Sequence, residues 1–198
     1  SAVVVADTQT LEGRQTQAAM LSSVGSSSVR VFVDEEQSAD FETAHVPETI
    51  GFSAFEAGAL SGVRTGDAAL VTQAELDAFD VPGADMIEIG SSGRVSLNVS
   101  NAMGEPQRVE FGRTLENAVV VLTGTMSTFG DPYVLRVVDR DATGFSFVVD
   151  GWEYQTSLQS RTETIHWVAV EAGVHTLEDG RVLEAGTVLA ATDSGSVA

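Results

Sequence analysis

The most restrictive feature of this sequence is that its two halves repeat one another. The block Glu48–Gly58 returns 115 residues later as Glu163–Gly173, with seven of the eleven positions identical. Two shorter blocks return at an offset of 116, Ala2–Val5 as Ala118–Val121 and Val33–Asp34 as Val149–Asp150. Three blocks that keep their spacing to within one residue indicate an internal duplication. We therefore expect the chain to build the same fold twice.

Short runs rich in Val, Phe and Thr, separated by Gly, Ser, Asp and Asn, predict β-strands. Within Phe145–Val149 the large side chains alternate, as they do in a strand with one buried face. Only Thr72–Phe79 has a helical pattern, with Glu75 three residues after a capping Thr72. Many short strands predict an all-β chain. The predicted strands are Ala2–Ala6, Val29–Asp34, Ile50–Phe55, Met86–Ile89, Val95–Val99, Val119–Thr123, Val134–Val138, Phe145–Val149, Thr164–Val170 and Arg181–Leu189.

The repeat predicts two tandem antiparallel β-sandwich domains, residues 1–70 and residues 86–198, joined by a connector at 71–85. The two copies are unequal at the front, because Val95–Val99 and Val109–Phe111 precede Val119 while nothing precedes Ser1. Either the sequence is a fragment of a longer chain, or its first repeat lacks strands. A missing strand would expose a sheet edge. Residues 181–191, the connector or another chain could fill that edge.

Charge and composition exclude several classes of function. The chain has 29 acidic residues and 10 basic ones, all arginine, giving a net charge of -19 and no cysteine. Without a basic cluster, nucleic acid and anionic membrane surfaces are poor partners. No apolar run reaches the roughly 18 residues of a spanning helix, so we expect no membrane insertion.

The acid excess also carries a prediction about location. Salt screens the self-repulsion of such a surface, so we interpret the acidity and the missing lysine as adaptation to a marine or high-salt exterior. A GC-rich genome would bias composition in the same direction. We expect an extracellular or cell-surface protein.

No catalytic constellation stands out, and we expect no enzyme. The sequence has no Gly-x-Ser-x-Gly elbow and no phosphate-binding glycine loop. Its three histidines do not supply the usual three ligands of a catalytic zinc ion. Calcium is kept as a candidate ion because Asp139 and Asp141 have the spacing that opens a calcium loop, although the closing Glu is missing. The weak metal candidates are Asp34, Glu36, Asp139 and Asp141.

The segment Trp152-Glu153-Tyr154 directly follows a predicted strand. Aromatic rings combine an apolar face with a polar group, so sugar rings can stack on them while a carboxylate accepts hydroxyl hydrogen bonds. The alternative is that Trp152 packs against the sheet, since tryptophan is usually largely buried. Trp167 lies within an apolar run and is predicted to be core. In the first repeat, Glu36 stands at the position of Trp152.

The order of blocks in the second repeat resembles the H-type lectin domain, a six-stranded antiparallel β-sandwich. It is also similar to a broader set of bacterial and archaeal extracellular repeats. The resemblance covers Val109–Gly173 well and Ala2–Gly58 less well. The blocks that carry it are Arg108–Phe111, Ala118–Leu122, Leu135–Val138, Thr143–Phe145, Trp152 and Ile165–Glu171.

The resemblance implies a binding site for N-acetylgalactosamine-type sugars at the subunit interfaces of a trimer. It implies an arginine on the middle strand and a tryptophan-containing loop, and it carries these roles onto Arg136, Trp152 and Glu153, with Tyr154 adjacent. The first repeat departs from this pattern, with Met20 and Glu36 at those positions.

Two functions from different classes follow. We expect a non-catalytic, lectin-like carbohydrate-binding protein that recognises a glycan or cell-surface polysaccharide and forms a homo-oligomer or larger assembly. The alternative is a structural subunit of an extracellular filament, surface layer or virion, in which a donated strand completes the first repeat. A glycan-degrading enzyme is disfavoured, because no repeated pair of acids stands out.

Overall fold

Strands dominate the computed structural model, which describes residues 2–9, 17–35, 47–66, 87–127, 131–152 and 154–187. The prediction of an all-β chain is confirmed. The predicted helix Thr72–Phe79 and the connector 71–85 lie outside the described residues. No helix in the described part is long and apolar enough to cross a membrane. The elements are β1 (Ala2–Thr8), β2 (Gln17–Val24), β3 (Val29–Glu35), β4 (Ile50–Glu56), β5 (Gly58–Gly66), β6 (Ile87–Asn98), α2 (Val99–Ala102), β7 (Gln107–Glu110), β8 (Ala118–Gly124), β9 (Val134–Arg140), β10 (Gly144–Asp150), β11 (Thr162–Glu171), β12 (Gly173–Leu177) and β13 (Val182–Ala185).

Two differences from the predicted strands have a physical reason. Strands β2 and β5 escaped prediction because they are rich in Ala, Ser and Gly, which have weak strand propensity. The described part of the predicted strand Met86–Ile89 and most of the predicted strand Val95–Val99 belong to one strand, β6, because β5 and β11 pair with it on either side. Gly93 lies opposite Trp167, and a Cβ atom there would lie 2.6 Å from the indole ring. The indole therefore needs glycine at this position.

The duplication holds down to the register of the paired strands. Strand β1 pairs with β4 so that Ala2 lies opposite Glu56, and β8 pairs with β11 so that Ala118 lies opposite Glu171. These are the same pairs displaced by the sequence offsets of 116 and 115. Both repeats also turn from one strand into the next at a glycine with positive φ, Gly58 at 129° and Gly173 at 139°.

The hairpins β2–β3 and β9–β10 match equally well. Each shifts its register at one residue, Ser22 in the first repeat and Val138 in the second, and these positions are 116 residues apart. A β-bulge is a local irregularity that sequence similarity at these positions does not require. Its recurrence at equivalent positions shows that the two hairpins have the same backbone conformation there.

The second repeat is a closed two-layer sandwich. One layer has the strand order β7-β10-β9, and the other contains the adjacent strands β6-β11-β8 of a larger sheet. Between them the rings of Phe111, Phe145 and Trp167 lie with centroids 5.8–6.4 Å apart. Trp167 is buried, as predicted, and so are the alternating Phe145, Phe147 and Val149.

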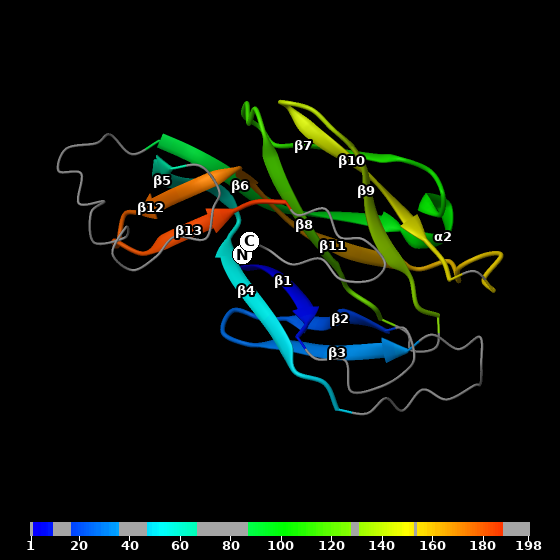
Figure 1. Ribbon diagram of the computed structural model, residues 1–198. Coiled ribbons are helices and arrows are strands. Elements are labelled where there is room, and N and C mark those ends of the chain that lie inside the picture. Colours follow the sequence, from blue (N-terminus) through cyan, green and yellow to red (C-terminus); the bar gives the residue numbers. More distant parts are fainter. Residues whose placement is uncertain are drawn as a thin grey trace, which may run out of the picture.

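The first repeat packs against the second repeat (Figure 1). Strand β5 joins the six-stranded sheet β13-β12-β5-β6-β11-β8, so strands from both predicted domain ranges share one sheet. Strand β1 lies against β11, where Val3 and Val5 form a second core with Val168 and Val170. Strand β11 is therefore buried on both faces, which explains its almost continuous apolar sequence.

Side chains of the second repeat form hydrogen bonds with main-chain groups along one edge of β1. The Val4 N–H donates to His166 Nδ1 at 3.0 Å, and the Ala6 N–H donates to Thr123 Oγ1 at 2.9 Å. The Thr123 hydroxyl in turn donates to the Ala6 carbonyl at 3.1 Å. This edge of the β1–β4 ribbon is thus satisfied without a neighbouring strand.

The burial of His166 makes stability depend on pH. Burial and, secondarily, the positive charge of Arg94 lower the pKa of His166 to about 4, from its ordinary 6.5. The unfolded chain therefore takes up the proton first, so stability is full above about pH 6.5 and falls as the pH drops toward 4. For the wild type, we expect the urea concentration at half unfolding to be lower at pH 5 than at pH 7.

His166→Asn is the matched variant, because its amide oxygen accepts a hydrogen bond at a position like that of Nδ1 and does not titrate. We expect the difference in midpoint between wild type and variant to shrink from pH 7 to pH 5, as measured by urea unfolding at both values. Parallel pH profiles for the two proteins would contradict this role of His166.

Candidate functional site

Arg136, the predicted sugar-binding arginine, lies on β9 at an edge of its sheet. The resemblance placed this arginine on a middle strand, and the structure corrects that, because β10 is the middle strand of β7-β10-β9. The Arg136 Nε atom donates to Asp150 Oδ2 at 2.8 Å, and both side chains are exposed. The guanidinium is thus engaged by a carboxylate of the neighbouring strand.

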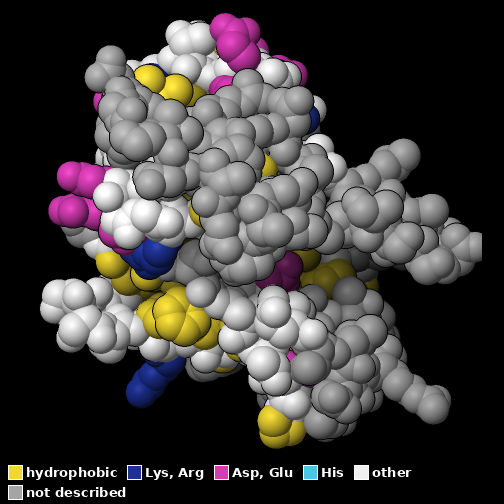
Figure 2. Space-filling view, turned by 60° about the vertical axis from the view of Figure 1, so that its left-hand side comes forward, with side chains coloured by type: hydrophobic (Ala, Val, Ile, Leu, Met, Phe, Trp, Pro, Cys, Tyr) yellow, Lys and Arg dark blue, Asp and Glu magenta, His cyan; other side chains and the backbone are white. Residues whose placement is uncertain are grey.

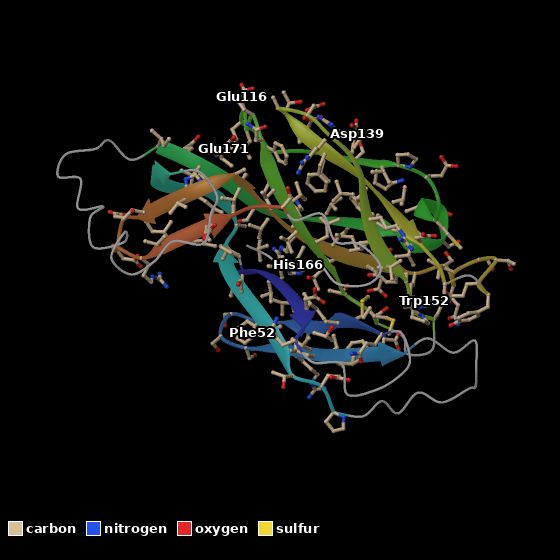
Figure 3. All side chains as sticks on the ribbon, viewed as in Figure 1. Phe52, Glu116, Asp139, Trp152, His166 and Glu171 are labelled. Carbon is tan, nitrogen blue, oxygen red and sulfur yellow. The ribbon has the colours of Figure 1, made fainter. Side chains whose placement is uncertain are left out.

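Trp152 and Tyr154 lie just beyond the end of β10 (Figure 3 labels Trp152). A turn forms there, in which the Trp152 N–H donates to Gln155 Oε1 at 2.7 Å and the Gln155 N–H donates to the Trp152 carbonyl at 2.8 Å. The indole Nε1 atom is buried, with no hydrogen-bond partner in the described part of the chain. The Tyr154 ring is 41% exposed. Glu153 lies outside the described residues.

Three of the four weak metal candidates lie among the described residues, where they form no metal-binding cluster. Asp34 is buried on β3, Asp139 is exposed on β9, and Glu36 lies outside the described residues. No group of three or more His, Asp or Glu side chains that could hold a metal ion occurs among the residues with a described position.

Asp141 stabilises a turn. Its Oδ1 atom accepts hydrogen bonds from the Thr143 N–H at 2.7 Å, the Gly144 N–H at 3.0 Å and Arg108 Nη2 at 2.8 Å. The contact with Arg108 is the main reason that the pKa of Asp141 lies well below its usual range. The segment that resembles a calcium loop therefore uses this carboxylate for the turn between β9 and β10.

A buried polar network that the sequence analysis missed holds the start of β11. Glu163 accepts hydrogen bonds of 2.8 Å from Thr125 Oγ1, from the Ser127 N–H and from Arg161 Nε. Arg161 also forms an ion pair with the buried Asp131. The carboxylate of Glu163 is satisfied by these partners, so the network is structural. Its one sequence signal was that Glu163 falls within the repeated block.

The first repeat differs from the second in what covers its strands. In the second repeat β11 lies between β8 and β6, and β10 lies between β9 and β7. In the first repeat the equivalent strands β4 and β3 pair only with β1 and β2 within the described ranges. No counterparts of β6 and β7 therefore occur in the described part of the first repeat.

The open edge of β4 carries main-chain groups available for pairing. The Val4 N–H donates to His166, so Val4 does not exchange main-chain hydrogen bonds with Ala54, which lies opposite it in the ribbon. In an antiparallel ribbon, hydrogen-bonded pairs alternate with pairs that are not hydrogen-bonded, so Ala6 and Phe52 are also a pair without hydrogen bonds. The N–H and C=O groups of Phe52 and Ala54 therefore point away from β1. Of the three predicted fillings for this edge, the described part of residues 181–191 does not provide it, since β4 pairs with β1 alone among the described strands while β13 pairs with β12. The connector lies outside the described residues.

An apolar groove of about 520 Å³ lies beside this edge, where the interior of the first sandwich would be. Phe52 stands at the position of Trp167 but is 60% exposed, against 6% for Trp167. Figure 2 shows hydrophobic side chains at the surface in the lower part of the molecule, which holds β1–β4. The groove is lined by Ala2, Val4, Phe52 and Ala54 and by residues 24–29 of the turn between β2 and β3.

This contrast predicts unequal costs for equivalent substitutions. We expect Trp167→Ala to destabilise the fold by about 3–5 kcal/mol, since it empties a packed core. Phe52→Ala is expected to change stability by no more than about 0.5 kcal/mol, because the ring is exposed. Urea unfolding of both variants measures the difference. A loss of several kcal/mol in Phe52→Ala would show that the groove is covered in solution by the chain itself.

Comparison of the chain with protein-family models, with curated proteins and with solved structures found no match. The likeness to H-type lectins therefore rests on the residues quoted from the sequence. The second repeat therefore provides the comparison for the candidate site, which is the β4 edge of the first repeat and the groove beside it.

Proposed function

We propose that this protein is a non-catalytic structural module that joins other polypeptide chains by accepting a strand at β4. The observation that supports this proposal is that β11 pairs with β6 while the equivalent edge of β4 has no strand in the described part of the chain. Strand addition to an exposed edge is a common way to bind an extended segment, since main-chain hydrogen bonds supply affinity. An unfilled edge is also an aggregation hazard, which a specific partner removes.

In this proposal the chain is two tandem sandwiches of H-type-lectin-like order, of which the first is an incomplete copy of the second. The partner strand would complete the first copy as β6 completes the second. A subunit of an extracellular filament, surface layer or virion fits this arrangement, with the acidic surface kept soluble by surrounding salt. Assembly, with other chains or with copies of itself, is then the main role.

The strand that fills this position in the second repeat provides the test. We expect a fluorescent peptide with the sequence Glu88–Asn98 to bind the whole chain saturably, as measured by fluorescence anisotropy. Ala54→Pro is expected to weaken binding at least tenfold, because proline removes an outward N–H from the edge. No bond within the β1–β4 ribbon is lost by this change, so circular dichroism should show an intact fold.

Ala54→Ser is the matched control, since it changes the same exposed side chain but keeps the N–H group. It should bind the peptide like the wild type. Absence of saturable binding to the wild type, or equal binding by Ala54→Pro, would contradict strand addition at β4. Sedimentation of the chain alone shows whether copies of the chain supply the strand.

As a second candidate function we propose glycan binding at the end of β10. The observation that favours it is the exposed ring of Tyr154, four residues after the Asp150 that holds Arg136. A sugar face can stack on such a ring, with the guanidinium as a hydrogen-bond donor to hydroxyl groups. Several sites in an assembly would raise the affinity of weak single sites.

Tyr154→Ala is expected to abolish glycan binding while leaving stability within about 0.5 kcal/mol, because the ring is exposed. A glycan array, run with and without calcium, measures it. Tyr154→Phe keeps the ring and should retain most of the signal. Binding that Tyr154→Ala leaves unchanged would contradict the assignment of this site.

A further inference from the structure

The groove of the first repeat corresponds to a filled space in the second repeat. There Phe111, which is buried, lies with its ring centroid 5.8 Å from that of Phe145 and 6.4 Å from that of Trp167. Leu115, four residues later, is also buried in the same core. The segment that carries both side chains precedes β8, and no counterpart of it occurs in the described part of the first repeat.

Main-chain hydrogen bonds fix this segment in the second repeat. Strand β7 pairs with β10, with Glu110 opposite Gly144. The Phe111 N–H then donates to the Thr143 carbonyl, and the Leu115 N–H donates to the Ala142 carbonyl, both at 2.8 Å. The segment is thus an added strand followed by two anchored apolar side chains.

The offsets of the repeat place the equivalent acceptors around the groove. Thr143 and Ala142 correspond to Ser27 and Ser26, which are exposed in the turn between β2 and β3 and line the groove. Phe145 and Trp167 correspond to Val29 and Phe52, which also line it. The groove therefore has the carbonyl groups and the apolar walls that hold Phe111 in the other copy.

We propose that this groove binds an extended segment of another polypeptide with the chemistry of Gln107–Leu115, whose aromatic side chain inserts between Val29 and Phe52. The segment adds as a strand to the outer edge of β3, which has no neighbour there in the described ranges. This inference rests on the proposed function, because one donor chain supplies the strand beside β4 and, after a short connection, this second strand. It adds the side chain that the donor must carry.

The walls also set the size of that side chain. Valine at position 29 replaces the phenylalanine of the second repeat, and phenylalanine at position 52 replaces its tryptophan. Both walls are smaller, so the groove accommodates a larger ring than phenylalanine. A tryptophan at the position of Phe111 in the donor segment is expected to bind more tightly than phenylalanine.

The test uses the whole chain and a fluorescent peptide with the sequence Glu105–Asn117. We expect saturable binding by anisotropy, at least tenfold weaker when the peptide carries Phe111→Ser and several-fold tighter with Phe111→Trp. In the protein, Phe52→Ser is expected to weaken binding at least fivefold. Val138→Ser is the matched control, because it removes an exposed apolar side chain elsewhere and should leave binding unchanged.

Three results would overturn the proposal. The first is that the peptide does not bind saturably. The second is that the peptide carrying Phe111→Ser binds with the same affinity as the unchanged peptide. The third is self-association of the chain that Phe52→Ser abolishes without any peptide binding, which would show that a second copy covers the groove. The Glu88–Asn98 peptide reports separately on strand addition at β4, so failure of this inference is distinguishable from failure of the proposed function.

Discussion

The structure depends on the burial of both faces of β11. One face closes the second sandwich with Ile165, Trp167 and Ala169, and the other packs Val168 and Val170 against Val3 and Val5 of the first repeat. Burial of these apolar side chains stabilises the contact between the two repeats, together with the pairing of β5 with β6 and β12. The contacts of His166 and Thr123 with β1 then orient the β1–β4 ribbon. They satisfy the main-chain groups at its β1 edge, so its β4 edge faces away from the second repeat.

This arrangement gives two copies of one backbone different surroundings. The second copy is closed by β6 and β7, and its apolar positions are filled with large rings. The first copy has smaller or more exposed residues at the same positions, with Phe52 in place of Trp167. Such a difference is expected where one copy provides stability and the other provides an interaction surface, since an exposed apolar face usually marks a contact.

The sequence predicted part of the candidate site. The duplication indicated which residues of the first repeat are equivalent to Trp167 and to the strands β8–β11 of the second repeat, because the sequence offsets are constant. The groove could not be predicted, since it depends on how the turn at residues 24–29 meets Phe52 across the sandwich. The placement of Arg136 on an edge strand was also beyond the sequence, because strand order in a sheet is set by long-range pairing. The pairing of Asp141 with Arg108 likewise brings together residues from two strands.

The sequence alone determined that this chain is all-β and duplicated, because alternating apolar residues and two constant offsets are local and additive signals. It also determined which residues are equivalent in the two copies, including Gly58 and Gly173. Only the tertiary structure decided that β5 pairs with β6 and β12, and which edge of the first copy has no paired strand in the described part of the chain. Those outcomes depend on contacts between residues far apart in the sequence, such as Val4 with His166 and Ala6 with Thr123, which a local sequence pattern does not specify.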